Sequence, residues 1–172
     1  MTGLGLQFDF TLGTVYAAPI ATGILVLALV ILSWIDIRTL RLPDWLTLPL
    51  AALGIGLSAF WGGIPGFYQS LIGAGIGYGV IWLLATYWRR SRGVDGIGLG
   101  DAKLLAAGGA WAGPYALPWI LLVSSGLGLV FAGLAFVLDR NKSALAGAAR
   151  IPFGPFLSLG IVFAWLVVQR PY

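Results

Sequence analysis

The chain has 172 residues, of which 59% are hydrophobic and only 9% are charged, and its mean hydropathy is +0.95. This composition lies far outside the range of soluble proteins and indicates an integral membrane protein. The chain contains no cysteine and no histidine, and its six acidic residues are all aspartates. Thiolate or imidazole metal sites, and Cys–His or Ser–His nucleophilic catalysis, are therefore not expected.

In chain order, residues 1–16 form a tail that carries no positive charge, unlike the basic start of a cleaved signal peptide. Six apolar segments follow, and each is predicted to cross the membrane as a helix. They cover about 17–35, 45–61, 67–88, 102–116, 117–138 and 151–168. The uncharged stretch 104–138 is too long for one span, and Pro114 and Pro118 mark its break. We therefore predict an all-α bundle that forms a single domain over residues 1–172.

The lysine and arginine residues predict the orientation of this bundle. Nine of the ten fall in three polar links between the predicted spans, namely Arg38, Arg41, Arg89, Arg90, Arg92, Lys103, Arg140, Lys142 and Arg150. Cytoplasmic loops carry such an excess of positive charge. The three links are therefore predicted to be cytoplasmic and both termini extracytoplasmic. The net charge of +4 then reflects topology within a lipid bilayer, and no nucleic-acid partner is expected.

Two aspartates are placed where catalysis could use them. Asp36 ends the first predicted helix and Asp101 begins the fourth, both on the predicted cytoplasmic side. Two carboxyl groups that face each other share a proton, so that one can activate a water and the other can protonate a carbonyl oxygen. This aspartic-protease chemistry needs no metal and no cofactor. Alternatively, Asp101 and Asp44 could simply cap helices, and Asp36 could pair with a neighbouring arginine.

Three motifs make the chain resemble the type IV prepilin peptidase family of membrane-embedded aspartic proteases. The first motif is the stretch 36–44, an aspartate followed by Pro43-Asp44. The second is Gly98-Leu-Gly100-Asp101 with Lys103 two residues further on, and the third is the proline-rich stretch 151–156. The motifs occur in the family's order, and the resemblance extends over about residues 17–168.

The resemblance implies that the protein cleaves short basic leader peptides from prepilins or pseudopilins at the cytoplasmic face of the bacterial inner membrane. Asp36 and Asp101 would be the catalytic dyad. Among supporting residues, Gly98 and Gly100 would shape a loop that admits an extended substrate. Lys103 would orient or tune Asp101, and Pro43 and Asp44 would support the first motif. Many members also methylate the new N-terminus and carry a cysteine-containing insertion; this chain has neither the cysteines nor the insertion, so methylation is not expected.

The two aspartates are not expected to be equivalent. Asp101 lies at the positive end of a helix dipole and near Lys103, whereas Asp36 lies at the negative end of another helix. The sequence therefore predicts that the shared proton resides mainly on Asp36. Two alternatives from other classes are a small ion-coupled transporter or channel, in which glycine-rich helices and intramembrane carboxylates also occur, and a non-catalytic assembly subunit.

Overall fold

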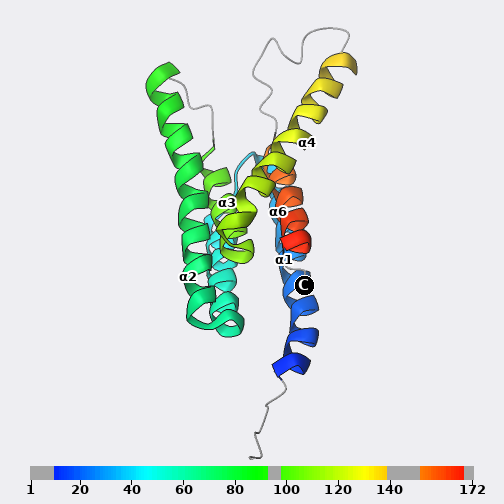
Figure 1. Cartoon of the computed structure of the whole chain (residues 1–172). Helices are drawn as coiled ribbons and strands as arrows, with labels where there is room; N and C mark the ends of the chain where they lie inside the picture. Colours follow the sequence, from blue (N-terminus) through cyan, green and yellow to red (C-terminus); the bar gives the residue numbers. More distant parts are fainter. Residues whose placement is uncertain (1–9, 93–97, 139–151, 169–172) are drawn as a thin grey trace, which may run out of the picture.

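The computed structural model of the protein describes residues 10–92, 98–138 and 152–168, and every element in these ranges is helical (Figure 1). The elements are α1 (Phe10–Thr39), α2 (Asp44–Arg92), α3 (Leu99–Ala112), the 3-10 helix η1 (Pro114–Ala116), α4 (Leu117–Leu138) and α6 (Gly154–Val168). Residues 1–9 of the predicted tail, and most of the polar link after α4, lie outside the described residues. The predicted all-α fold is confirmed.

Within the described residues, four helical segments are long and apolar enough to cross a membrane. They are Pro19–Thr39, Asp44–Gly63, Gly66–Ser91 and Pro114–Ala135, and the shorter segment Gly154–Val167 is also apolar. An α-helix satisfies its backbone hydrogen bonds internally, which is what a segment surrounded by hydrocarbon requires. The protein is therefore a multi-pass membrane protein.

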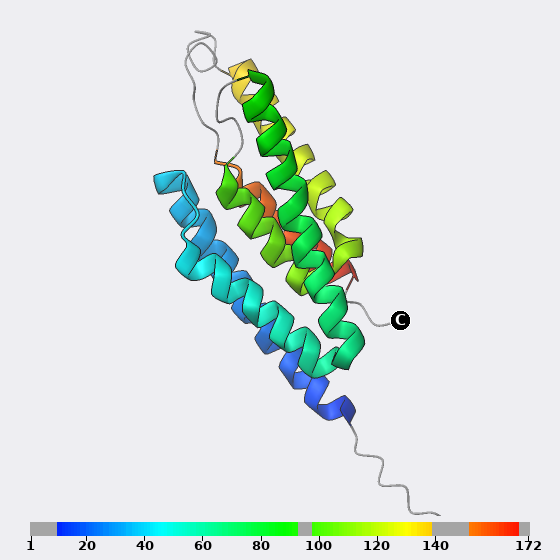
Figure 2. The same ribbon diagram turned by 90° about the vertical axis from the view of Figure 1, so that its left-hand side faces the viewer.

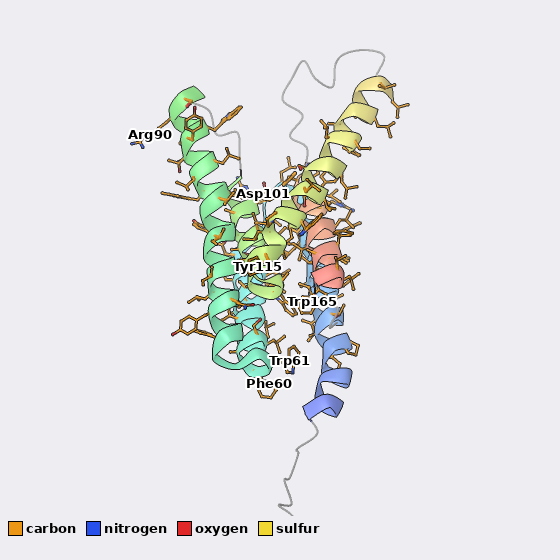
Figure 3. All side chains as sticks on the ribbon, viewed as in Figure 1. Phe60, Trp61, Arg90, Asp101, Tyr115 and Trp165 are labelled. Atoms are coloured by element: carbon orange, nitrogen blue, oxygen red, sulfur yellow. The ribbon has the colours of Figure 1, made fainter. Side chains whose placement is uncertain are left out.

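A single glycine divides α2 into two antiparallel halves. Gly63 has φ 58° and ψ −149°, a conformation outside the helical region that residues with a side chain rarely adopt. The chain reverses direction there, and the two halves form a hairpin at the end of the molecule that carries Phe60 and Trp61 (Figures 1 and 3). The two helices predicted over 45–61 and 67–88 correspond to these halves.

The short helix α3 lies at the centre of the bundle. Its 14 residues span about 21 Å, less than the roughly 30 Å of a hydrocarbon core. From Leu104 to Ala112 most of its side chains are buried, and it packs against both halves of α2 and against α6 (Figure 2). The helix ends at Gly113, whose φ is 78°, and η1 then leads into α4.

Glycine allows the backbones of α2 and α3 to touch. An added Cβ at Gly73 would lie 2.9 Å from the carbonyl carbon of Gly109, and one at Gly77 would lie 2.7 Å from the Leu105 oxygen. By contrast, a Cβ at Gly75 or Gly79 would meet nothing within 4 Å. Only one of the two glycine faces on this half of α2 therefore serves helix packing.

The arrangement brings several helix ends together at one end of the bundle. The C-terminus of α1 and the N-terminal ends of α3 and α6 lie at similar heights there, while the second half of α2 and α4 continue past them and diverge (Figure 1). The start of α3 therefore lies at the base of the space between two longer helices.

Candidate active site

Asp36 lies in the last turn of α1 and is buried, with only 5% of its surface exposed. Its carboxylate oxygen Oδ2 accepts a hydrogen bond of 2.8 Å from the backbone N–H of Gly154, the first residue of α6. The N-terminal N–H groups of a helix lack partners within that helix, so a carboxylate is a fitting acceptor for them. Asp36 thus connects the end of α1 to the start of α6.

Asp101 lies in the first turn of α3, a helix that is not among the candidate membrane spans. Gly98 precedes the helix as its N-cap residue, and the Gly98 oxygen accepts a hydrogen bond of 3.1 Å from the Asp101 N–H. Burial, followed by the negative charge of Asp36 as the smaller cause, raises the pKa of the Asp101 carboxyl to about 7. Asp101 is therefore suited to hold a proton near neutral pH.

Both aspartates line one cavity of about 1230 Å³. Figure 3 shows Asp101 at the base of the space between the second half of α2 and α4. One wall is apolar and combines residues of these two helices with the segment before α6, namely Ile81, Leu84, Pro118, Leu121, Leu122, Pro152 and Phe153. The cations Arg41 and Lys103 also border the cavity. An acid pair therefore lies beside a large, mainly apolar space that could hold an extended peptide.

Lys103 does not pair with Asp101. Its Nζ lies 2.5 Å from Oδ1 of Asp44, at the start of α2. Pro43, the residue before that helix, accepts backbone hydrogen bonds from Leu46 and Thr47 through its carbonyl oxygen. Lys103 of the second motif is thus joined to Asp44 of the first motif.

The two glycines of the second motif have different surroundings. A Cβ at Gly98 would lie 3.4 Å from Oδ2 of Asp101, an ordinary contact distance. A Cβ at Gly100 would lie 3.1 Å from the Cβ of Leu42 in the link between α1 and α2. Both residues border the cavity, but Gly100 also allows the start of α3 to approach that link closely.

The geometry around Asp36 disagrees with the protonation predicted from the sequence. For Asp36, that prediction considered only the C-terminal end of the dipole of α1. In the folded chain, Asp36 also accepts the N–H at the positive end of α6, and this contact stabilises the carboxylate. The structure therefore favours the opposite distribution of the shared proton, in which Asp101 holds it.

Sequence reasoning did not assign a role to two residues near Asp36. Gly154 provides the hydrogen bond described above, and the signal for it was the proline-rich stretch 151–156, which was recognised only as a motif. Leu40 adopts φ 53° just after α1, and its N–H donates to the Asp36 carbonyl oxygen at 2.8 Å. No sequence signal marked this left-handed helix end, since glycine or asparagine usually occupies it.

In the described part of the chain, no three metal-ligating side chains gather closely enough to hold a metal ion.

Comparison with known proteins gives a consistent result. Residues 23–133 match the family described as the type IV leader peptidase family. Three similar proteins, each named prepilin leader peptidase/N-methyltransferase, come from Aeromonas salmonicida strain A449, Escherichia coli strain K12 and Burkholderia pseudomallei strain 1026b. They are 41%, 44% and 40% identical over 148, 151 and 133 residues, which cover 85%, 83% and 77% of this chain.

The matched regions make up 49%, 62% and 41% of those three proteins. The chain thus spans about half the length of the curated relatives it matches. No solved structure matches it.

Proposed function

The chain belongs to the type IV leader peptidase family, and from that premise we propose that it cleaves the leader peptides of prepilins or pseudopilins. The observation that carries the proposal is that Asp36 and Asp101 line one cavity, although they lie on different helices that are far apart in the sequence. The cavity is large enough for a peptide segment, and its apolar wall suits a substrate that approaches from the membrane.

The proposed reaction is hydrolysis by a pair of aspartates. One aspartate, as the carboxylate, takes a proton from a water molecule while the water oxygen forms a bond to the scissile carbonyl carbon. The other aspartate gives its proton to the carbonyl oxygen, which produces a neutral tetrahedral intermediate. The first aspartate then gives the water proton to the leaving nitrogen, and the C–N bond breaks. As the carbonyl group re-forms, a hydroxyl proton of the intermediate passes to the second aspartate, so both carboxyl groups regain their starting states.

We further propose that the site faces the cytoplasm in the bacterial inner membrane, with both termini on the other side. The support is the distribution of charge, because Arg38, Arg41 and Lys103 lie at the helix ends that also carry the two aspartates. Figure 3 shows Arg90 beyond Asp101, at the same end of the molecule. Positive charge on one face is typical of the cytoplasmic side.

Peptidase activity is the part of the relatives' two-part name that the aspartate pair can explain. The expected absence of methylation stays a prediction, and mass spectrometry of the cleaved product would test it. A product that gains a methyl group from a methyl donor in the presence of the purified chain would contradict it.

The proposal is tested by cleavage of a leader-bearing prepilin with the full chain in detergent micelles or nanodiscs. Asp36→Asn and Asp101→Asn should each lower the rate by at least about a thousandfold. Their thermal unfolding should remain cooperative, since the variants change one oxygen to nitrogen. If the unmodified chain cleaves no leader peptide, the peptidase proposal fails; if either variant cleaves at the normal rate, the dyad assignment fails. Ion flux through proteoliposomes that depends on Asp36, without cleavage, would favour the transporter alternative.

A further inference from the structure

The contact between Gly154 and Asp36 assigns separate roles to the two aspartates. Resting on the proposed peptidase function, we infer that the Gly154 N–H is a positioning group that keeps Asp36 as the water-activating carboxylate and leaves Asp101 as the proton donor. The hydrogen bond to Asp36 Oδ2 is 2.8 Å long and buried. It joins residues 118 positions apart in the chain, so it is a tertiary feature of the site.

The identity of residue 154 is explained by the position of the carboxylate. A Cβ at this residue would lie 2.6 Å from Asp36 Oδ2 and 3.0 Å from its Cγ. Contacts this close cannot be kept, so any side chain would displace either Asp36 or the start of α6. The φ angle of Gly154 is not positive, so its backbone conformation is open to other residues. The lack of space beside Asp36 is therefore what requires glycine here.

The N–H also lies at a favourable place for stabilising charge. Gly154 is the first residue of a helix of 15 residues, and Pro155 follows it. The first N–H groups of a helix have no partner within the helix and carry its positive partial charge. Because proline has no N–H, Pro155 cannot donate to Asp36. Of the first two residues of α6, Gly154 alone can supply a backbone donor.

The surroundings of Asp101 complement this arrangement. The described cations that border the cavity are Arg41 and Lys103, and Lys103 is paired with Asp44. The backbone N–H of Asp101 donates to the Gly98 oxygen, and burial together with the charge of Asp36 raises the pKa of the Asp101 carboxyl to about 7. A carboxyl group in such an environment keeps its proton until a substrate oxygen can receive it. In the reaction, the water proton therefore goes to Asp36, and the Asp101 proton goes to the scissile carbonyl oxygen.

The first test removes the N–H without adding a side chain. Cell-free synthesis of the full chain into nanodiscs can place glycolic acid at residue 154, which replaces the amide N–H with an ester oxygen. A matched control places the hydroxy-acid analogue of leucine at residue 157, whose N–H donates instead to the Phe153 oxygen at 3.0 Å. Both variants lose one N–H near the start of α6, but only the first loses the donor to Asp36.

The expected result for the ester at residue 154 is a change in the pH profile of leader cleavage. The acidic limb of kcat/KM should move to higher pH by about one unit, because the carboxylate loses a hydrogen bond that favours it. In addition, kcat should fall by about tenfold with KM little changed. The ester at residue 157 should leave the position of the limb unchanged. If the acidic limb of kcat/KM lies at the same pH in the two ester variants, the inference is overturned.

A second test does not depend on cleavage. Infrared spectra at about pH 5.5 detect the C=O stretch of protonated carboxyl groups, while ordinary exposed aspartates are ionised at that pH. The band should persist in Asp36→Asn, which retains Asp101, and should be lost in Asp101→Asn, which retains the carboxylate at Asp36. The opposite pattern would overturn the inference even if cleavage is observed, whereas a chain that shows the expected bands but cuts no leader would contradict only the proposed function.

A side-chain variant separates displacement of Asp36 from general damage to the fold. Gly154→Ala should abolish cleavage through the close contact described above. Gly128→Ala is the control, because its Cβ would lie 3.7 Å from the ring of Phe153, an ordinary contact in the same neighbourhood. The control should retain cleavage; full activity in Gly154→Ala would show that residue 154 does not position Asp36.

Discussion

Lys103 is bonded to Asp44, with 2.5 Å between Nζ and Oδ1, although Asp101 is only two residues away from it in the sequence. The contact joins the fifth residue of α3 to the first residue of α2. Both side chains are partly exposed, at 29% for Lys103 and 57% for Asp44. The pair therefore holds the two helix starts in register beside the cavity, and its contribution to stability is limited by contact with solvent.

Removal of this pair should have a small effect on the free energy of unfolding. In a double-mutant cycle of Lys103→Gln and Asp44→Asn, we expect a coupling energy of about 0.2–1 kcal/mol, as for other exposed pairs. The measurement is unfolding in mixed micelles of each single variant and of the double variant. Strictly additive single effects would show that the two side chains do not interact in solution.

The glycine contacts between α2 and α3 should be much more sensitive. Gly73→Ala places a methyl group against the backbone of Gly109 and Gly113, and should destabilise the protein by about 2 kcal/mol or more. Gly75→Ala is the matched control on the opposite face, where nothing lies within 4 Å. It should be neutral, or stabilising by up to about 1 kcal/mol through higher helix propensity. Similar losses in both variants would contradict this assignment of the packing face.

The fold could be predicted well from the sequence because a membrane leaves few choices. An apolar segment about 20 residues long must be helical, and the uncharged turn around Gly63 and the prolines near 114–118 mark where helices break. Alternation of the spans then places Asp36 and Asp101 at the same end of the bundle. That topology allows the two residues to line one cavity, as they do in the structure.

The contacts inside the site could not be predicted in the same way. Glycines recur at every second position from 73 to 79, so the pattern does not tell which face of the helix meets α3. Lys103 has a long side chain that can reach several partners, and its choice depends on how α2 and α3 are rotated. The hydrogen bond from Gly154 to Asp36 depends on the packing of α6 against α1, which no local pattern specifies.

Trp111 provides a test of the polar contacts that hold α3 in the bundle. Its side chain is 2% exposed, and its Nε1 donates a hydrogen bond of 2.8 Å to the Leu50 oxygen in α2. Trp111→Phe removes this bond and part of the contact with Trp165, so we expect a loss of about 1–3 kcal/mol in the free energy of unfolding. Trp45→Phe, at a residue that is 69% exposed, should change stability by less than about 0.5 kcal/mol. Equal effects would indicate that the Trp111 contact does not persist in the bilayer or micelle.

The raised pKa of Asp101 predicts how stability depends on pH. The carboxyl has a pKa of about 4 in the unfolded chain and about 7 in the folded chain. Between these values the folded protein binds more protons than the unfolded protein, so this group makes the free energy of unfolding fall as pH rises from about 4 to about 7. Below about 4 both states hold the proton, and above about 7 both have lost it, so the contribution is constant there.

Asp101→Asn should remove this dependence, because the amide does not titrate. The variant is expected to have the same thermal unfolding temperature as the unmodified chain near pH 4, and a higher one at pH 7 and above. Differential scanning fluorimetry in detergent at several pH values measures the difference, and comparison at each pH cancels most contributions of the aspartates that both chains retain. Parallel curves for the two proteins would mean that Asp101 titrates near its ordinary range, and that its burial beside Asp36 does not retain the proton needed for an acid catalyst.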